Sequence, residues 1–435
     1  MVGRESDSGA SISMLGVQAL VVLLWCWSWI PQMIDLINLG RQSPALGVDP
    51  GRSAGAEMAY TAIIRAIIAV SLFLIISALT SRQPIRLRSI TLLLAPWVTL
   101  NGSYVIQGGT NKETLLFPFV VLAFALNARN LRKVYALLRS LLYITALSSL
   151  VLGIMTPSLY LSDPSKEVGN EKAIVGSLLL NGLFPTSNQL GVTLGIGIPL
   201  IVMTSKRKTK WIGVSILLLA MAWASSRTSL AATAVVLLVM AFGARGGERT
   251  VRSVIRPAVV GLCLLAVVTP FVFRDPKDFN GRVAIWRTSL DFVTGGHLLD
   301  GGGAMIFREV SPVTTSIGAI TSTGHNIFVT VLTVGGLIAL AAVAALWTTY
   351  LATSIHNFSI DRYPVIFLLS VSAVAILEDP VRAFVIAPSA FLLVPIFVMP
   401  LVMAEHRRKV LEGSFSQDEA SSRREHRGGG SNERS

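Results

Sequence analysis

The chain has 435 residues, of which 52% are hydrophobic and only 14% are charged, and its mean hydropathy is +0.64. One soluble core cannot bury so many apolar side chains, which excludes an ordinary soluble domain. The net charge of +13 would favour a nucleic-acid partner in a soluble protein, but here the basic residues lie in loops beside apolar segments, so we expect no nucleic acid to bind.

Apolar segments of roughly 16 to 25 residues follow one another along the chain. A helix of about this length crosses the hydrocarbon core of a membrane, which is about 30 Å thick. Residues 1–11 precede the first segment, and we expect them to lie in the cytoplasm. The sequence therefore predicts an all-α, polytopic integral membrane protein with about twelve transmembrane helices in a domain over residues 12–403. The expected helices cover residues 12–30, 58–80, 89–106, 113–128, 134–155, 185–204, 211–225, 229–244, 253–273, 326–350, 363–378 and 383–403.

The charged loops between these segments indicate the topology. Loops 82–88, 129–133, 206–210 and 245–252 each carry at least three basic residues, and they fall on one side of the predicted membrane. The positive-inside rule makes that side cytoplasmic, with both termini inside, and places the long loop 274–324 outside. Residues 404–435 have too few apolar residues to pack, so we expect a disordered cytoplasmic tail.

The outer loop carries an apolar stripe with the spacing of an amphipathic helix. Arg282 and Arg287 lie off this stripe. Such a helix can rest in the headgroup region and hold its arginines at the height of lipid phosphates, although a solvated polar face would also explain them. The stripe comprises Val283, Trp286, Leu290 and Val293.

Two further residues are expected on the same outer face. Arg227 lies in the short connection 225–228 between two apolar segments, and His325 lies at the outer entry to the next helix after the long loop. A snorkelling arginine and a structural histidine are the ordinary alternatives. Together with Arg282, however, they form a set that suits transfer from a lipid pyrophosphate, because arginines neutralise phosphates and a histidine can take a proton from a hydroxyl.

Other charged residues are harder to interpret. Arg65 lies inside an apolar segment, where a charge is costly. It could contact the same lipid phosphate, snorkel to the surface or pair with another residue of the protein. Glu378, Asp379 and Arg382 form a charged group in the last outer connection. They could line the same cavity, but we favour a solvated loop.

Several short motifs occur in an order that resembles the O-antigen ligase and O-antigen polymerase (Wzy-type) superfamily of bacterial envelope glycosyltransferases. The resemblance covers about residues 182–350. The motifs are Gly182–Gly191, Ser226–Arg227, Gly281–Arg282 with Trp286, Gly301 and Gly303, and His325–Asn326 with Gly335–Gly336.

The resemblance implies an inverting, metal-independent transferase that needs no cofactor. It would move a glycan from an undecaprenyl-pyrophosphate-type carrier to an acceptor hydroxyl on the outer face of the bacterial cytoplasmic membrane. By analogy Arg227 and Arg282 would bind the pyrophosphate, with Arg287 as the second candidate in its motif, and His325 would activate the acceptor. Asn188 and Asn326 would line the site, although the first motif departs from the family at Thr186–Ser187.

The expected partners are the lipid-linked donor, a glycan or lipid acceptor, membrane lipids and other polysaccharide-assembly proteins. The sequence does not separate a polymerase from a ligase, because both use the same donor. Two other classes of protein remain open: a transporter or flippase of lipid-linked glycans, and a non-catalytic subunit of an export assembly. A transporter should depend on polar groups near mid-membrane, whereas a transferase needs a fixed outer site.

Overall fold

The computed structural model describes residues 5–40, 52–81, 86–109, 111–162, 173–204, 207–243, 251–307, 311–317, 321 and 323–405. Apart from the short antiparallel pair β1 (Leu161–Ser162) and β2 (Leu179–Leu180), the regular structure in these ranges is helical. The helices are α1 (Glu5–Leu39), α2 (Ala54–Thr80), α3 (Leu87–Ile106), α4 (Lys112–Leu126), α5 (Leu131–Met155), α6 (Pro157–Tyr160), α7 (Ser187–Thr204), α8 (Arg207–Trp223), α9 (Arg227–Gly243), the π-helix Val251–Ile255, α11 (Arg256–Val272), α12 (Asp278–Thr294), α13 (Pro312–Ile317), α14 (Ile327–His356), α15 (Tyr363–Val374), the 3₁₀ turn Arg382–Phe384 and the helix Ala390–Glu405.

Six helices in the described ranges are long and apolar enough to cross a membrane. They are Ser13–Leu39 of α1, α2, α3, α5, Arg252–Val272 and α14. Four further apolar helices are shorter: Ser187–Met203, Arg227–Ala241, Tyr363–Val374 and Ala390–Glu405. The all-α class is confirmed, and the apolar helices suit a multi-pass membrane protein, whereas the number of about twelve spans stays a prediction.

Each predicted apolar segment overlaps a helix, but the last helix begins at Ala390 and not at residue 383. Pro388 explains the late start, because the residue before a proline is disfavoured in the α conformation. The 3₁₀ turn Arg382–Phe384 precedes this helix, followed by the extended residue Val385 and a turn at residues 388–389.

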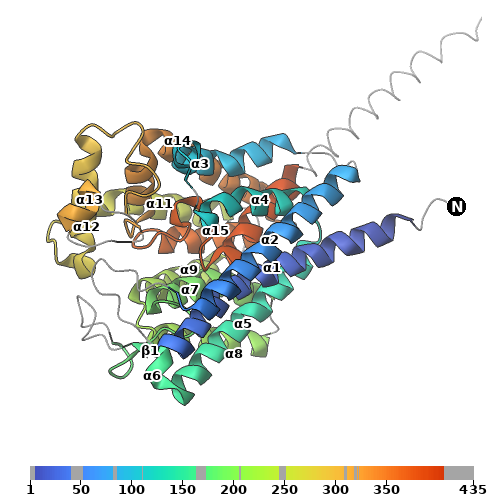
Figure 1. Ribbon diagram of the computed structural model, residues 1–435, viewed down its shortest axis with the longest axis horizontal. Coiled ribbons are helices and arrows are strands. Elements are labelled where there is room, and N and C mark those ends of the chain that lie inside the picture. Colours follow the sequence, from blue (N-terminus) through green and yellow to red (C-terminus); the bar gives the residue numbers. More distant parts are fainter. Residues whose placement is uncertain are drawn as a thin grey trace, which may run out of the picture.

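The helices pack as an elongated bundle with a small outlying group at one end. Figure 1 shows α1 and α2 side by side along one edge, and α12 and α13 together at the end away from the N-terminus. The outer face of α2 is strongly apolar, as expected for a helix that faces lipid. Its exposed large apolar side chains are Met58, Ile68, Leu72, Phe73, Ile76 and Leu79.

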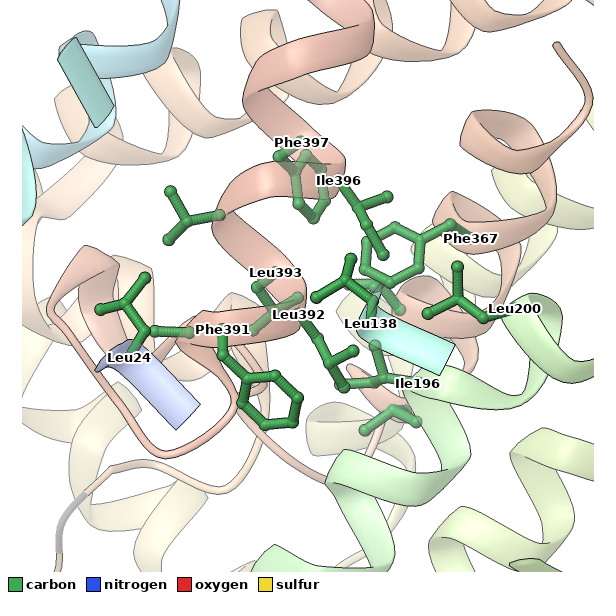
Figure 2. Packing of buried hydrophobic residues seen from close by; sticks show 14 of the residues in the cluster. Leu24, Leu138, Ile196, Leu200, Phe367, Phe391, Leu392, Leu393, Ile396 and Phe397 are labelled. Carbon is green, nitrogen blue, oxygen red and sulfur yellow. The ribbon is translucent and has the colours of Figure 1, made fainter. Parts of the chain in front are cut away.

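The core surrounds α15 on all sides. Residues 364–374 of this helix are all buried, which is why its sequence is apolar around its whole circumference. Figure 2 shows the centre of this packing, where side chains from α1, α5, α7, α15 and the last helix meet. The labelled members include Leu24, Leu138, Ile196, Phe367 and Phe391. The loop that follows α15 is therefore anchored at the middle of the molecule.

The helix α14 is broken at Gly336, which has φ 63° and ψ −161°. The segment after α12 crosses the helix at this break. The N–H groups of Gly302 and Gly303 donate to the carbonyls of Thr333 and Val334 at 2.7 and 2.8 Å, and Leu337 donates to Leu298 at 2.9 Å. The break therefore loses its intrahelical hydrogen bonds but gains replacements from the crossing segment.

The amphipathic helix expected in the outer loop is present as α12, but its apolar stripe does not rest on lipid. Val283, Trp286 and Val293 are completely buried inside the protein, and the first two pack against Val329 of α14. The headgroup interpretation of the stripe is therefore wrong. An isolated segment cannot reveal whether its apolar face meets lipid or another helix, because either contact removes it from water.

Candidate functional site

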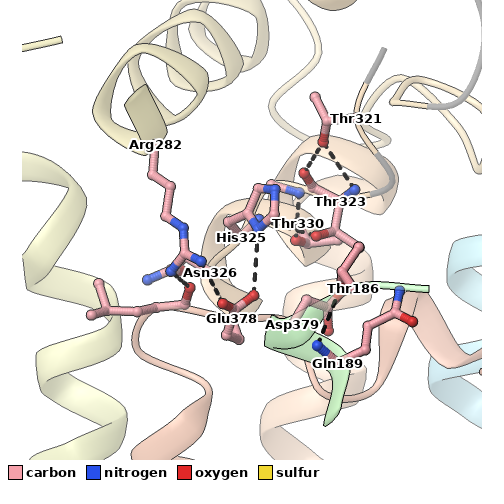
Figure 3. Close-up of polar contacts among 12 residues, drawn as sticks. Thr186, Gln189, Arg282, Thr321, Thr323, His325, Asn326, Thr330, Glu378 and Asp379 are labelled. Carbon is pink, nitrogen blue, oxygen red and sulfur yellow. Dashed lines mark hydrogen bonds and ion pairs between the residues drawn. The ribbon is translucent and has the colours of Figure 1, made fainter. Parts of the chain in front are cut away.

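Three ionisable side chains from distant parts of the chain meet beside the start of α14 (Figure 3). Arg282 Nη2 forms a short ion pair with Glu378 Oε1, and Glu378 Oε2 lies 3.4 Å from His325 Nδ1. The side chains of Arg282 and Glu378 are 10% and 12% exposed, whereas that of His325 is 28% exposed. The histidine is thus the member of this group that incoming molecules can reach.

A tight turn of the backbone places Arg282 in this group. Phe279, Asn280 and Gly281 have φ angles of 50°, 60° and 83°, so the regular part of α12 begins at Arg282. Such left-handed values cost about 1 kcal/mol or more in a residue with a Cβ atom. The Arg282 guanidinium also donates from Nη1 to the Leu377 carbonyl. It therefore holds the backbone of Leu377 and the side chain of Glu378.

His325 is held just before α14 by contacts on both sides. Its own φ is 52°, and its N–H donates to Thr323 Oγ1 at 3.2 Å. The preceding Gly324 carbonyl accepts a hydrogen bond from Trp286 Nε1 at 2.9 Å. The helix α12 therefore fixes both the carboxylate that faces the histidine and the backbone that carries it.

Asn326 joins the segments on which the group depends. Its side chain is completely buried: Oδ1 caps α14 by accepting from the Val329 N–H at 3.0 Å, and Nδ2 donates to the carbonyls of Ala266 and Ile376 at 2.9 and 2.7 Å. With both amide hydrogens and the oxygen engaged, Asn326 serves as a structural clamp between α11, α14 and the loop after α15. It does not present a free group to a ligand.

The electrostatics of the group keep Glu378 ionised. Burial raises the pKa of its carboxyl, but the charge of Arg282 and the contact with His325 more than offset this effect and lower the pKa from 4.5 to about 2. A buried carboxylate of this kind is tolerated only when it is paired and hydrogen-bonded. Near neutral pH the group therefore offers His325 a fixed negative partner.

The other candidates from the sequence lie on exposed or half-buried positions. Arg287 is five residues after Arg282 and thus roughly 140° around the helix, with an exposed side chain. Arg227 begins α9 and is exposed, and Asn188 is half-buried in the first turn of α7. Arg65 is exposed on the face of α2 that also carries Ile68 and Leu72. The structure thus joins Arg282 to His325 and leaves these four outside the ion-paired group.

Sequence reasoning underestimated Glu378. The interpretation of residues 378–382 as a solvated loop is wrong for its two acids, since Glu378 and Asp379 are 9% and 7% exposed. Asp379 Oδ1 accepts from the backbone N–H groups of Val381 and Arg382 at 3.2 and 2.9 Å. The sequence did carry a signal, since these two acids directly follow an apolar segment and precede Pro380. If such a loop is buried, its acids need partners inside the protein.

A small apolar pocket begins next to this loop. Its walls come from α3, α4, α14 and the chain after Asp379. Aromatic side chains supply much of the lining: Phe117, Trp347, Phe384 and Phe397. Such a surface can hold hydrocarbon, and it starts at Pro380, two residues beyond the carboxylate that faces His325.

Within the described ranges no three His, Cys, Asp or Glu side chains gather in a way that could hold a metal ion. No protein-family model matches the chain, and no curated protein or solved structure is significantly similar to it. The resemblance to the O-antigen ligase and polymerase superfamily therefore rests on the short motifs alone.

Proposed function

We propose that this protein is a membrane glycosyltransferase of cell-surface polysaccharide biosynthesis, either a polymerase or a ligase, that acts at the outer face of a bacterial cytoplasmic membrane. The observation that carries the proposal is His325, partly exposed and held at Nδ1 by a buried carboxylate, in a chain of membrane-type helices. A histidine paired in this way is suited to act as a general base. The substrate class comes from the motif resemblance.

The proposed reaction needs one base and a stable leaving group. The oxygen of an acceptor hydroxyl attacks the anomeric carbon of the lipid-linked glycan, and His325 takes the hydroxyl proton. The bond between this carbon and the pyrophosphate oxygen breaks, and the lipid pyrophosphate leaves with the electron pair. Attack from the side opposite the leaving group inverts the anomeric carbon.

The leaving pyrophosphate needs positive charge, and the exposed guanidinium groups of Arg227 and Arg287 are its candidate ligands. Arg282 is buried and binds Glu378 and the Leu377 carbonyl. We assign it to holding Glu378, which differs from the pyrophosphate-binding role that the resemblance implies. The apolar pocket beyond Asp379 is suited to part of the polyprenyl chain.

The test begins with cells that lack the gene and express the wild type, His325→Ala or His297→Ala at equal membrane levels. His297 is a matched control, because it precedes His325 in the predicted outer loop but its ring stacks on that of Phe292, with the centroids 4.3 Å apart. We expect the deletion to accumulate a lipid-linked glycan outside the cytoplasm. Wild type and His297→Ala should clear it into longer or transferred glycan, whereas His325→Ala should lose about 10²-fold or more in rate.

The proposal fails if His325→Ala restores the polymer as well as the wild type. That result would favour a non-catalytic subunit of an export assembly. Accumulation of the same lipid-linked glycan on the cytoplasmic side in the deletion would instead favour a transporter.

One observation does favour a transporter as the second candidate. The helix α14, long enough to cross a membrane, is broken at Gly336, and broken helices are common at transporter binding sites. A purified protein in vesicles separates the two functions. A transporter moves the lipid-linked glycan between leaflets unchanged, whereas the transferase releases the lipid pyrophosphate and leaves the leaflet distribution as it was.

A further inference from the structure

Glu378 has a separate partner for each of its oxygens. Arg282 holds Oε1, and Oε2 faces His325 Nδ1 at 3.4 Å. An ionised carboxylate can only accept hydrogen bonds, so a hydrogen bond across this contact requires a proton on Nδ1. The pKa of Glu378 is about 2, so the carboxyl stays ionised well below neutral pH.

The position of that proton decides what the other ring nitrogen can do. A neutral imidazole carries one proton, so a ring protonated at Nδ1 has a free lone pair at Nε2. We infer that Glu378 is a positioning residue that selects the Nδ1-protonated form of His325. This leaves the Nε2 lone pair free to take the proton from the hydroxyl of the acceptor substrate. The use of that lone pair rests on the proposed function, whereas the position of the ring proton does not.

The surroundings of Glu378 are built to keep it in place. Arg282 donates hydrogen bonds to the Glu378 carboxylate and to the carbonyl of the preceding Leu377. Asn326, the residue after His325, donates from its side chain to the Ile376 carbonyl. The N–H of the next residue, Ile327, donates to the Ala375 carbonyl at 3.1 Å. The two facing side chains are thus carried by backbone segments bonded directly to each other, which limits their relative movement.

The inference predicts the effect of a nearly isosteric change. In Glu378→Gln the amide oxygen can still accept from Arg282, but the group that then faces His325 is an NH₂, which donates. Nδ1 must then accept, and the ring proton moves to Nε2. The lone pair that the reaction needs is lost although the shape of the site is kept.

The first measurement is ¹⁵N NMR of the full-length protein in lipid vesicles, labelled at the histidine ring nitrogens, at a pH at which the rings are neutral. The His325 signals are assigned by their disappearance in His325→Gln. In the wild type we expect a protonated Nδ1 and an unprotonated Nε2, and in Glu378→Gln the reverse. A wild-type ring protonated at Nε2 overturns the inference, even if the variant does not fold.

The second measurement is turnover of the lipid-linked glycan extracted from the deletion cells. We expect Glu378→Gln to lower kcat by about 10² to 10⁴-fold with little change in KM, because the base is affected and binding is not. Asp379→Asn is the matched control. It also removes one buried acid, but an amide oxygen can still accept from the backbone N–H groups of Val381 and Arg382, so ring signals and rate should stay near those of the wild type.

The two proposals fail in different ways. If the wild type turns over the glycan and Glu378→Gln keeps its kcat, Glu378 is not a positioning residue but the transferase function stands. If the wild type does not turn over the glycan while the ring signals invert in the variant, the contact exists and the proposed function is wrong.

Discussion

At the scale of single residues, Asn326 shows how one buried side chain supports a site without touching a substrate. Its amide satisfies two backbone carbonyls and one N–H group that would otherwise be buried without partners. These groups belong to α11, to the loop after α15 and to α14. The relative position of His325 and Glu378 therefore depends on a neighbour of the histidine as well as on the pair itself.

We predict that Asn326→Ala destabilises the protein by about 2–5 kcal/mol, because an unpaired buried backbone group costs roughly 1–3 kcal/mol. The measurement is the thermal unfolding midpoint of the detergent-solubilised protein. Asn357→Ala is the control at the other end of α14, where the half-buried Asn357 donates to the Thr353 carbonyl at 2.9 Å within the same helix. We expect it to lower stability by less than about 1 kcal/mol. Equal losses in both variants would contradict the clamp.

At the scale of elements, the break in α14 explains a motif whose meaning the sequence left open. The glycines at 301, 303, 335 and 336 lie where the segment after α12 crosses the helix backbone to backbone. A Cβ atom added to Gly336 would lie 2.2 Å from the Leu299 carbonyl group, and one added to Gly301 would lie 2.5 Å from the Val334 carbonyl carbon. Gly301 and Gly336 require glycine because two backbones are in contact there.

We predict that Gly336→Ala lowers the free energy of unfolding by about 2–4 kcal/mol, since it adds both a backbone clash and a left-handed residue with a Cβ atom. Gly261→Ala in α11 is the control, because nothing lies within 4 Å of its added Cβ atom and its φ is not positive. There we expect no loss, or a gain of about 0.5–1 kcal/mol from the better helix former. Thermal unfolding of both variants in detergent tests this difference. A Gly336→Ala protein as stable as the wild type would show that the crossing segment can move away.

At the scale of the whole molecule, the basic loops predict the orientation in the membrane. The positive-inside rule predicts that the start of α8, with Lys208, faces the cytoplasm and that the segment after α12, with Leu299, faces outside. Both side chains are exposed, Leu299 by 64%. They are therefore suitable for labelling from either side of the membrane.

We expect Leu299→Cys to react with a membrane-impermeant maleimide in intact spheroplasts, and Lys208→Cys to react only after the membrane is opened. The background for both variants is Cys26→Ser with Cys263→Ser, since the native thiols are free and half-buried. Labelling of Lys208→Cys from outside would invert the predicted topology and move the His325 site to the cytoplasmic face.

The sequence by itself determined the helical class and the position of nearly every long helix. It also singled out Arg282 and His325 as candidate site residues, and the structure places these two in one group with Glu378. The sequence could do so because hydrocarbon imposes a nearly fixed apolar length on each helix that crosses it, and because charges next to such segments are few and conspicuous. The number of membrane crossings and their orientation remain predictions of the same kind.

Only the tertiary structure decided what those residues contact. Glu378 is 96 residues from Arg282 and 53 from His325 along the chain, so no local pattern indicates that they form one group. The apolar stripe of α12 likewise fits either lipid or protein until its neighbour in α14 is known. A charge or an apolar face acquires its role from the group placed opposite it, and in this protein those groups come from distant segments that are brought together by packing.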